Sequence, residues 1–155
     1  MKIIQVTGRE IFDSRGWPTL ACDIVLEDGV VVTASVPSGI SRGSYEAREL
    51  RDGGKRFWGQ GVLKAIENLE QMIAPVLVGQ EPSAIELDLR LLELDNTPNK
   101  ANLGANAMLA ASMALYRAHA HAEKIELYEL IAYACGAETI SMPFPLFNVI
   151  NGGLH

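Results

Sequence analysis

Apolar and polar positions alternate along the first part of the chain in the way that is typical of β-strands. β-Branched residues recur from Ile3 to Phe12, and large apolar residues take every second position from Leu20 to Leu26. A third apolar segment runs from Val30 to Val36, directly after Asp28-Gly29, a strong hairpin signal. The pattern predicts a meander of three antiparallel strands.

The period of the pattern then changes to that of helices. Two amphipathic helices are predicted. The first has an apolar face of Val62, Ile66, Leu69 and Ile73 and ends at Pro75. The second has an apolar face of Ile85, Leu89 and Leu92 and a solvated face of Glu86, Asp88, Glu93 and Asp95. A last helix is predicted from about Glu126 to Ala134, with Gly136 as its C-terminal cap. The first part of the chain is therefore expected to fold as strands followed by helices.

The segment from Gly104 to Ala118 is apolar around most of a helical circumference. A helix of this kind must be buried on nearly all sides. Because three strands and a few helices cover one side of it, the sequence favours packing of its other side against a further domain.

The end of the chain combines an apolar segment with a candidate site residue. Met142 to Ile150 predicts a strand buried on both faces in a parallel sheet or barrel, and Gly152-Gly153 permits a tight turn or the close approach of a ligand. His155 then falls where active sites of α/β proteins are commonly built. The alternative is a flexible terminal tail.

Composition narrows the possible functions. The chain has 155 residues, 48% of them hydrophobic and 21% charged, which is typical of a globular protein. A formal net charge of -6 offers no basic surface for nucleic acid or anionic membranes. No segment has the roughly 18 consecutive apolar residues of a membrane span, and the first residues have no signal-peptide pattern, so we expect a cytoplasmic protein. Cys22 and Cys135 are predicted to be reduced, buried thiols.

Few residues are grouped in a way that suggests chemistry. The loop from Gly39 to Gly43 lacks the Gly-Lys-Ser/Thr ending of a phosphate-binding loop, so it is either an exposed connection or an active-site lid that offers Ser41 to a metal or anion. His119 and His121 face different directions on one helix and cannot form a pair of metal ligands. No trio of carboxylates at strand ends is visible.

Several motifs nevertheless resemble enolase in order and spacing. They are Gly8-Arg9-Glu10-Ile11-Phe12-Asp13-Ser14-Arg15-Gly16, Val36-Pro37-Ser38-Gly39, Tyr45-Glu46-Ala47, Glu49-Leu50-Arg51-Asp52-Gly53, Gly59 to Val62, Leu94-Asp95-Asn96-Thr97-Pro98-Asn99-Lys100, Leu103-Gly104-Ala105-Asn106-Ala107, and Asn148 to Gly153 with His155. The resemblance covers the whole chain.

This resemblance implies an α+β fold, with a three-stranded antiparallel meander followed by a helical bundle and the start of an α/β barrel at the C-terminus. Residues 1–135 would be the N-terminal domain, and residues 136–155 a linker with the first barrel strand. Enolases are lyases of glycolysis that interconvert 2-phosphoglycerate and phosphoenolpyruvate with two Mg²⁺ ions. They are commonly dimers or larger, and some are found at cell surfaces; no direct nucleic-acid binding is expected.

Two site residues follow from the resemblance. Ser41 matches the lid serine that coordinates the second Mg²⁺, and His155 matches the substrate-contacting histidine of Asn-Gly-Gly-x-His. The family's metal-binding carboxylates, general-acid glutamate and lysine base would lie beyond residue 155. The chain alone is therefore expected to be inactive.

The sequence departs from the family at the proposed lid. Ile40 and Arg42 replace a small residue and a short hydroxyl residue, and Trp17 stands where the family has Asn after Ser-Arg-Gly. These exchanges leave the predicted fold intact and put ordinary turnover in question. A second hypothesis is a natural short protein that keeps the enolase-like domain as a non-catalytic binding or scaffold module.

Overall fold

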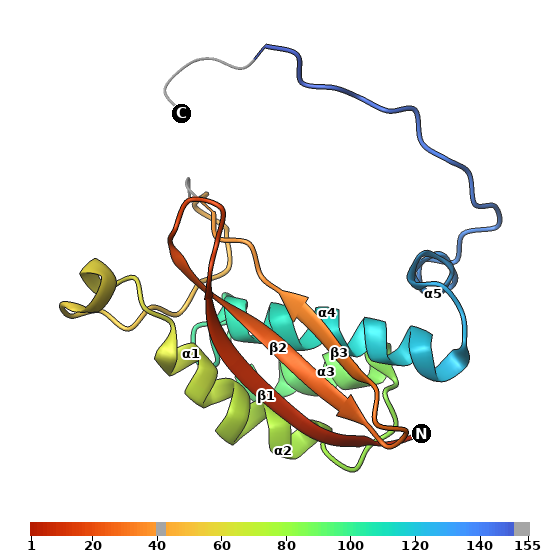
Figure 1. Cartoon of the computed structure of the whole chain (residues 1–155), viewed down its shortest axis with the longest axis horizontal. Coiled ribbons are helices and arrows are strands. Elements are labelled where there is room, and N and C mark those ends of the chain that lie inside the picture. Colours follow the sequence, from red (N-terminus) through yellow and green to blue (C-terminus); the bar gives the residue numbers. More distant parts are fainter. Residues whose placement is uncertain (40–42, 151–155) are drawn as a thin grey trace.

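The computed structural model describes residues 1–39 and 43–150. Its β-sheet contains β1 (Ile3–Phe12), β2 (Pro18–Leu26) and β3 (Val31–Ser35), paired antiparallel in the order β1-β2-β3 (Figure 1). At the β2–β3 turn, Gly29 adopts a φ of 86° and the N–H of Leu26 donates to the carbonyl oxygen of Val30 at 2.9 Å. The predicted meander is confirmed, and so is its hairpin at Asp28-Gly29.

Seven helical segments follow the sheet along the chain. They are η1 (Arg56–Gly59), α1 (Leu63–Asn68), η2 (Leu69–Ile73), α2 (Ala74–Leu77), α3 (Ala84–Asp95), α4 (Ala105–Glu123) and α5 (Leu127–Ala134). The sheet lies on one side of α4 and the shorter helices lie around its other sides (Figure 1). The α+β class expected from the sequence is confirmed.

The expected end of the first helix at Pro75 is wrong. The helical path continues to Leu77, with Pro75 in the first turn of α2. Leu69–Ile73 immediately before it form a π-helical turn. The wider backbone of such a turn accommodates a residue that donates no hydrogen bond and whose ring crowds the preceding turn.

The apolar face predicted for α3 is also wrong. Ile85, Leu89 and Leu92 are exposed, whereas Leu87 and Leu91 are buried. Both sets have helical spacing, so periodicity alone does not choose between them. The buried face also carries Asp95, which the sequence pattern had assigned to the solvated face together with Glu86, Asp88 and Glu93. Asp88 is half-buried and accepts a hydrogen bond from Ser112.

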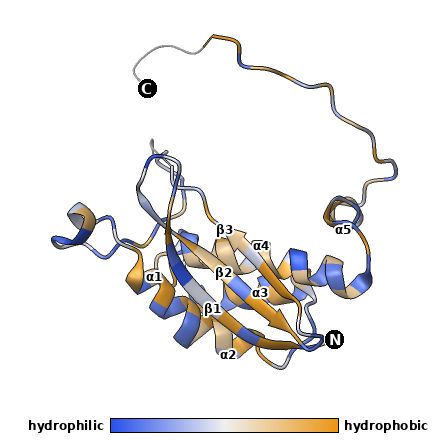
Figure 2. Ribbon diagram, in the orientation of Figure 1, coloured by the Kyte–Doolittle hydropathy of each residue, from blue (hydrophilic) through white to orange (hydrophobic). Residues whose placement is uncertain are grey.

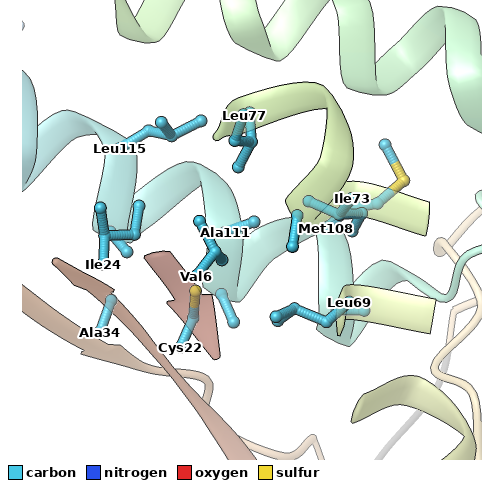
Figure 3. Close-up of a cluster of buried hydrophobic side chains, with 14 of the residues drawn as sticks. Val6, Cys22, Ile24, Ala34, Leu69, Ile73, Leu77, Met108, Ala111 and Leu115 are labelled. Atoms are coloured by element: carbon cyan, nitrogen blue, oxygen red, sulfur yellow. The ribbon is translucent and has the colours of Figure 1, made fainter. Parts of the chain in front are cut away.

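The core is formed between the sheet and α4. Figure 3 shows side chains of the sheet (Val6, Cys22, Ile24, Ala34), of the helical path from α1 to α2 (Leu69, Ile73, Leu77) and of α4 (Met108, Ala111, Leu115) in one cluster. Fully buried alanines lie along one face of α4, which lets neighbouring elements approach its backbone closely; they are Ala107, Ala110, Ala111, Ala114 and Ala118. Most of α4 is thus covered by this domain itself rather than by a further domain; Leu109 remains exposed.

The last helix ends as the sequence predicted. The side chain of Glu126 caps the first turn of α5 together with Glu129, and Gly136 follows the helix with a φ of 65°. The N–H groups of Gly136 and Ala137 donate to the carbonyl oxygens of Tyr133 and Ala132, the two bonds of a Schellman motif. Gly136 is therefore the glycine that permits this helix end.

The strand predicted over Met142 to Ile150 is not formed. This segment has no helix or strand, and it extends away from α5 without neighbouring elements (Figures 1 and 2). A strand needs partners for its backbone N–H and C=O groups, and no described element of the domain offers them here. Its large apolar side chains are almost fully exposed, Phe144 and Leu146 by 96% each.

The two cysteines differ in their surroundings. Cys22 is buried, and burial raises the pKa of its thiol to about 12, so the group stays neutral at physiological pH. Cys135 is exposed, which corrects the expectation that both thiols are buried. Within the described ranges, no helix is both long and apolar enough to cross a bilayer.

The corrected face of α3 yields a prediction about stability. Leu91→Ala should lower the free energy of unfolding by about 2–5 kcal/mol, because a cavity replaces a buried side chain. Leu89→Ala, the same substitution on the exposed face, should change it by less than about 0.5–1 kcal/mol. Urea denaturation of both variants measures the difference, and equal losses would contradict the assigned face.

The exposed C-terminal segment predicts self-association of the chain. At micromolar concentrations the 155-residue chain should sediment as species larger than a monomer and bind a hydrophobic dye, because its apolar side chains have no cover. A chain that ends at Glu138 is the matched control and should remain monomeric. A monodisperse monomer of the longer chain, without dye binding, would argue against this role of the segment.

Candidate functional site

The candidate site lies at the end of the sheet where the β1–β2 connection approaches the segment that follows β3 (Figure 1). The two predicted site residues, Ser41 and His155, lie outside the described residues. The structure does describe Val36 to Gly39 and the chain from Gly43 onward. It therefore shows how both flanks of the predicted lid are held.

Asp13 organises the β1–β2 connection. Its Oδ1 accepts hydrogen bonds from the backbone N–H groups of Arg15 and Trp17 at 2.9 Å each, and its Oδ2 pairs with the Arg15 guanidinium. The bond from the Trp17 N–H, with those from Arg15, holds the pKa of the Asp13 carboxyl below its usual value. Oriented in this way, Arg15 Nη2 donates to the carbonyl oxygen of Ser38 at 2.6 Å.

A second arginine reaches the same serine. Arg51 Nη2 donates to Ser38 Oγ at 2.8 Å, while Nη1 donates to the carbonyl oxygens of Pro18 and Gln60 at 2.6 and 2.8 Å. Its Nε and Nη2 also pair with Glu49. Arg51 thus joins the start of β2, the segment after β3 and the approach to α1.

The first described residues after the lid are tied to the helical layer. The N–H of Gly43 donates to Glu46 Oε2 at 2.8 Å, and the N–H of Arg48 donates to the carbonyl oxygen of Asn99 at 2.8 Å. The carbonyl oxygen of Arg48 accepts from the N–H of Ala105, the first residue of α4, at 2.9 Å. The segment is therefore anchored where α4 begins.

Asn106 strengthens this anchor from inside the fold. Its side-chain amide is buried and makes two bonds of 3.0 Å with Leu50, accepting from its N–H and donating to its carbonyl oxygen. A Cβ at Gly104 would lie 2.6 Å from Leu50 Cβ, which is too close, so the position requires glycine. The close approach of the two segments depends on both residues.

Asp95 shapes the loop that leads into α4. The carboxylate is fully buried and accepts hydrogen bonds from the N–H groups of Leu103 at 2.7 Å and Thr97 at 3.1 Å, and from the Thr97 hydroxyl. Burial favours the neutral acid, but these hydrogen bonds outweigh it and keep the pKa of Asp95 below its usual value. Asp95 is therefore a structural anion rather than a solvated surface charge.

Two hollows flank the described start of the lid. The larger, of about 680 Å³, is lined by Gly39, Glu46, Arg48 and Asn106 among others. The smaller, of about 310 Å³, lies among Arg15, Trp17, Ser38 and Arg51. Gly39, the last described residue before the predicted lid, lines both hollows.

The described residues offer charged groups but no metal centre of their own. Across residues 1–39 and 43–150, no three His, Cys, Asp or Glu side chains stand close enough to hold a metal ion together. Glu49 near the larger hollow is paired with Arg51, and Glu46 accepts from Gly43. The side chains in the described part of the chain therefore do not supply enough ligands for a complete magnesium site by themselves.

Trp17 occupies the rim of the smaller hollow. It is 42% exposed, and its ring packs edge-on against Trp58 at a centroid distance of 6.3 Å. The ring is therefore exposed, and a second aromatic ring covers part of it.

The two histidines of α4 bond to different parts of the fold. His119 Nδ1 accepts from the N–H of Ala84 at 3.3 Å, and His121 Nε2 lies 2.7 Å from Asp28 Oδ2. The contact with His121 lowers the pKa of Asp28. The two rings therefore have different partners and do not form a joint site.

Sequence reasoning missed the residues that hold the flanks of the lid. Arg51, Asp95 and Asn106 belong to the motifs quoted above, but no role was assigned to them. Asn106 did carry a signal, because an amide inside an otherwise apolar helix must find hydrogen-bond partners when buried. Asp95 was assigned to the solvated face because its charge was read as exposed, although its partners Thr97 and Leu103 lie close in sequence. Arg51 gave no such signal, since its bonds to Pro18 and Ser38 join segments distant in sequence.

Comparison with known proteins agrees with this architecture. Residues 3–131 match the family model described as "Enolase, N-terminal domain". The chain is also 51% identical over 157 aligned residues to a protein named "Enolase" from Elusimicrobium minutum (strain Pei191). That alignment covers 99% of this chain and 37% of the relative, so the chain spans little more than a third of that protein's length.

These matches extend over nearly all of the fold described above, from β1 into α5. The sheet, the α4 core and the anchored flanks of the lid thus form a domain of the kind found at the N-terminus of enolases. The chain belongs to the enolase family.

The buried anion in the loop before α4 gives a prediction about pH. Asp95→Asn should lower the free energy of unfolding at pH 7 by about 1–3 kcal/mol, because an amide NH₂ then faces a backbone N–H donor. Folding lowers the pKa of Asp95, so its stabilisation is present above the unfolded value near 3.9 and is lost as pH falls through the folded value. The penalty should therefore be constant above about pH 5 and shrink as the pH falls below about 4.

Urea denaturation at several pH values measures this penalty. Glu93→Gln is the matched control, because Glu93 lies on the exposed face of the same helix and loses its charge in the same chemical way. A penalty for Asp95→Asn that does not change with pH would show that the charge of Asp95 does not stabilise the loop.

Proposed function

We propose that this chain is the N-terminal part of an enolase, the lyase that interconverts 2-phosphoglycerate and phosphoenolpyruvate in glycolysis. The observation that carries the proposal is the family match over residues 3–131, together with the relative that is 51% identical. That relative is named "Enolase", and this chain covers 37% of its length. The complete gene product would be the enzyme, cytoplasmic and a homo-oligomer.

In the proposed arrangement, residues 1–135 form the N-terminal domain and residues 136–155 lead into a barrel. The extended apolar segment from Met142 to Ile150 would become the first barrel strand once neighbouring strands supply backbone partners. Its exposed side chains would then be covered. This assignment also accounts for the high apolar content of a segment that has no cover in the chain itself.

Ser41 is proposed to contribute a hydroxyl oxygen to a Mg²⁺ ion. Oxygen ligands suit this cation, and Mg²⁺ commonly takes only one or two protein ligands with water and substrate oxygens. The anchored flanks at Ser38 and Gly43 support this role because they hold the chain on both sides of Ser41. The remaining metal ligands, the general acid and the general base would come from residues beyond 155.

His155 is proposed to contact the substrate. It would follow the first barrel strand, at the strand end where barrel enzymes build their active sites. Removing a proton next to a carboxylate creates a dianion, and bound cations stabilise that charge. The N-terminal domain would therefore supply binding groups, and the proton transfer would depend on the barrel.

The test compares the complete gene product with the 155-residue chain. The complete protein should form phosphoenolpyruvate from 2-phosphoglycerate, lose this activity with a chelator, and regain it with Mg²⁺. The chain alone should show no turnover at saturating Mg²⁺. Ser41→Ala in the complete protein should raise the Mg²⁺ concentration for half-maximal activity by about tenfold or more.

Ser44→Ala is the matched control, because Ser44 is an exposed serine three residues further along. Its Mg²⁺ requirement should equal that of the unmodified protein. Turnover by the short chain would contradict the proposal that catalysis needs residues beyond 155. An unchanged Mg²⁺ requirement of Ser41→Ala would contradict the proposal that Ser41 binds Mg²⁺. A stop codon directly after codon 155 would instead favour the non-catalytic binding or scaffold module.

A further inference from the structure

We propose that Arg51 is a positioning residue for the proposed reaction, because it fixes Ser38 and with it the chain that leads toward Ser41. The inference rests on the proposed function and adds to it a residue with no direct role in binding. It is carried by the hydrogen bonds of Arg51 and Ser38, all of which lie in the described part of the chain.

Every donor of the Arg51 guanidinium is used within the protein. An arginine side chain has five N–H donors. Arg51 makes five hydrogen bonds: two from Nη1 to the carbonyl oxygens of Pro18 and Gln60, two from Nη2 to Ser38 Oγ and Glu49, and one from Nε to Glu49. Its side chain is only 12% exposed. No donor is left for a substrate anion, which identifies a structural rather than a ligand-binding arginine.

Ser38 is the acceptor that connects this arginine to the lid. Its hydroxyl accepts from Arg51 at 2.8 Å, and its carbonyl oxygen accepts from Arg15 at 2.6 Å. Two residues earlier, the carbonyl oxygen of Val36 accepts from the buried Thr19 hydroxyl at 2.6 Å. Three hydrogen bonds thus hold the segment from Val36 to Ser38, which leads toward Ser41.

Lysine cannot replace Arg51 in this role. A lysine ammonium has three donors on a flexible stem, whereas the planar guanidinium presents five in a fixed fork. The acceptors around Arg51 belong to four separate segments, at Pro18, Ser38, Glu49 and Gln60. A single ammonium therefore leaves at least one of them without a partner, and Ser38 is among the acceptors that compete for it.

The test is a double-mutant cycle in the complete gene product, read as kcat and KM for 2-phosphoglycerate. Ser38→Ala should lower kcat/KM by about tenfold, the effect of about one hydrogen bond to a charged group. Ser38→Thr keeps the hydroxyl and should restore most of this loss. Arg51→Lys should lower kcat/KM at least as much, and adding Ser38→Ala to Arg51→Lys should cause no further loss.

Two controls separate positioning from a general loss of stability. Arg90→Lys changes an arginine that pairs with Glu86 on the exposed face of α3, away from the lid, and should leave kcat and KM unchanged. The melting temperature of each variant is measured as well. If kcat/KM falls only in proportion to the folded fraction, or if the two substitutions have additive effects, Arg51 is not a positioning residue.

The outcomes also separate this inference from the proposed function. If the unmodified gene product does not convert 2-phosphoglycerate, the proposed function is wrong and the role of Arg51 falls with it. If it does convert the substrate but Ser38→Thr does not restore the loss in Ser38→Ala, only the inference about Arg51 is overturned. If Arg51→Lys does not fold, the comparison of Ser38→Ala with Ser38→Thr alone tests the role of the bond between Arg51 and Ser38, because both variants keep the arginine.

Discussion

The close packing of α4 against the sheet is the constraint on which the rest of this domain depends. Fully buried alanines line one face of the helix, so the elements packed there contact its backbone closely. The same helix carries Asn106 in its first turn, and this amide pairs with both backbone groups of Leu50. Core packing therefore also determines where the segment after the lid lies. A shift of α4 along the sheet would move the wall of the larger hollow with it.

Polar side chains that bond to the backbone hold the connections at the site. Asp13 orders the β1–β2 connection, Asp95 orders the loop before α4, and Arg51 joins four segments. Each of the three accepts from or donates to backbone groups, which exist at every position whatever the side chain. The β1–β2 connection thus tolerates a large ring at Trp17, because Asp13 bonds to the backbone N–H of this residue rather than to its side chain.

Much of the fold followed from the sequence, because periodicity reports burial directly. The three strands, their Asp28-Gly29 hairpin, the buried α4 and the Gly136 cap were predicted from local patterns and are present. The errors have tertiary causes. Ile85 and Leu91 each belong to a set of apolar residues with helical spacing, but the two sets lie on different faces of α3. Only the docking of α3 decides which face is buried. Pro75 is tolerated after a π turn that no simple pattern signals, and Met142 to Ile150 lacks strand partners. For the site, Ser41 and His155 were candidates from the sequence pattern, and only the resemblance gave them definite roles. The anchor Arg51 depends on contacts with Pro18 and Ser38 across long sequence separations.

The connections of Arg51 also bear on how this domain folds. Its bonds to Pro18 and Gln60 join positions 33 and 9 residues away, and the bond from Arg56 to Glu10 spans 46. Closing loops of this length costs chain entropy before any contact is gained, so we expect the arginine network to form after the β2–β3 hairpin and the helices, whose contacts are local. Regions with few buried apolar contacts are also the first to open in native-state fluctuations. We therefore expect the contacts around Arg51 to open before the packed core between the sheet and α4.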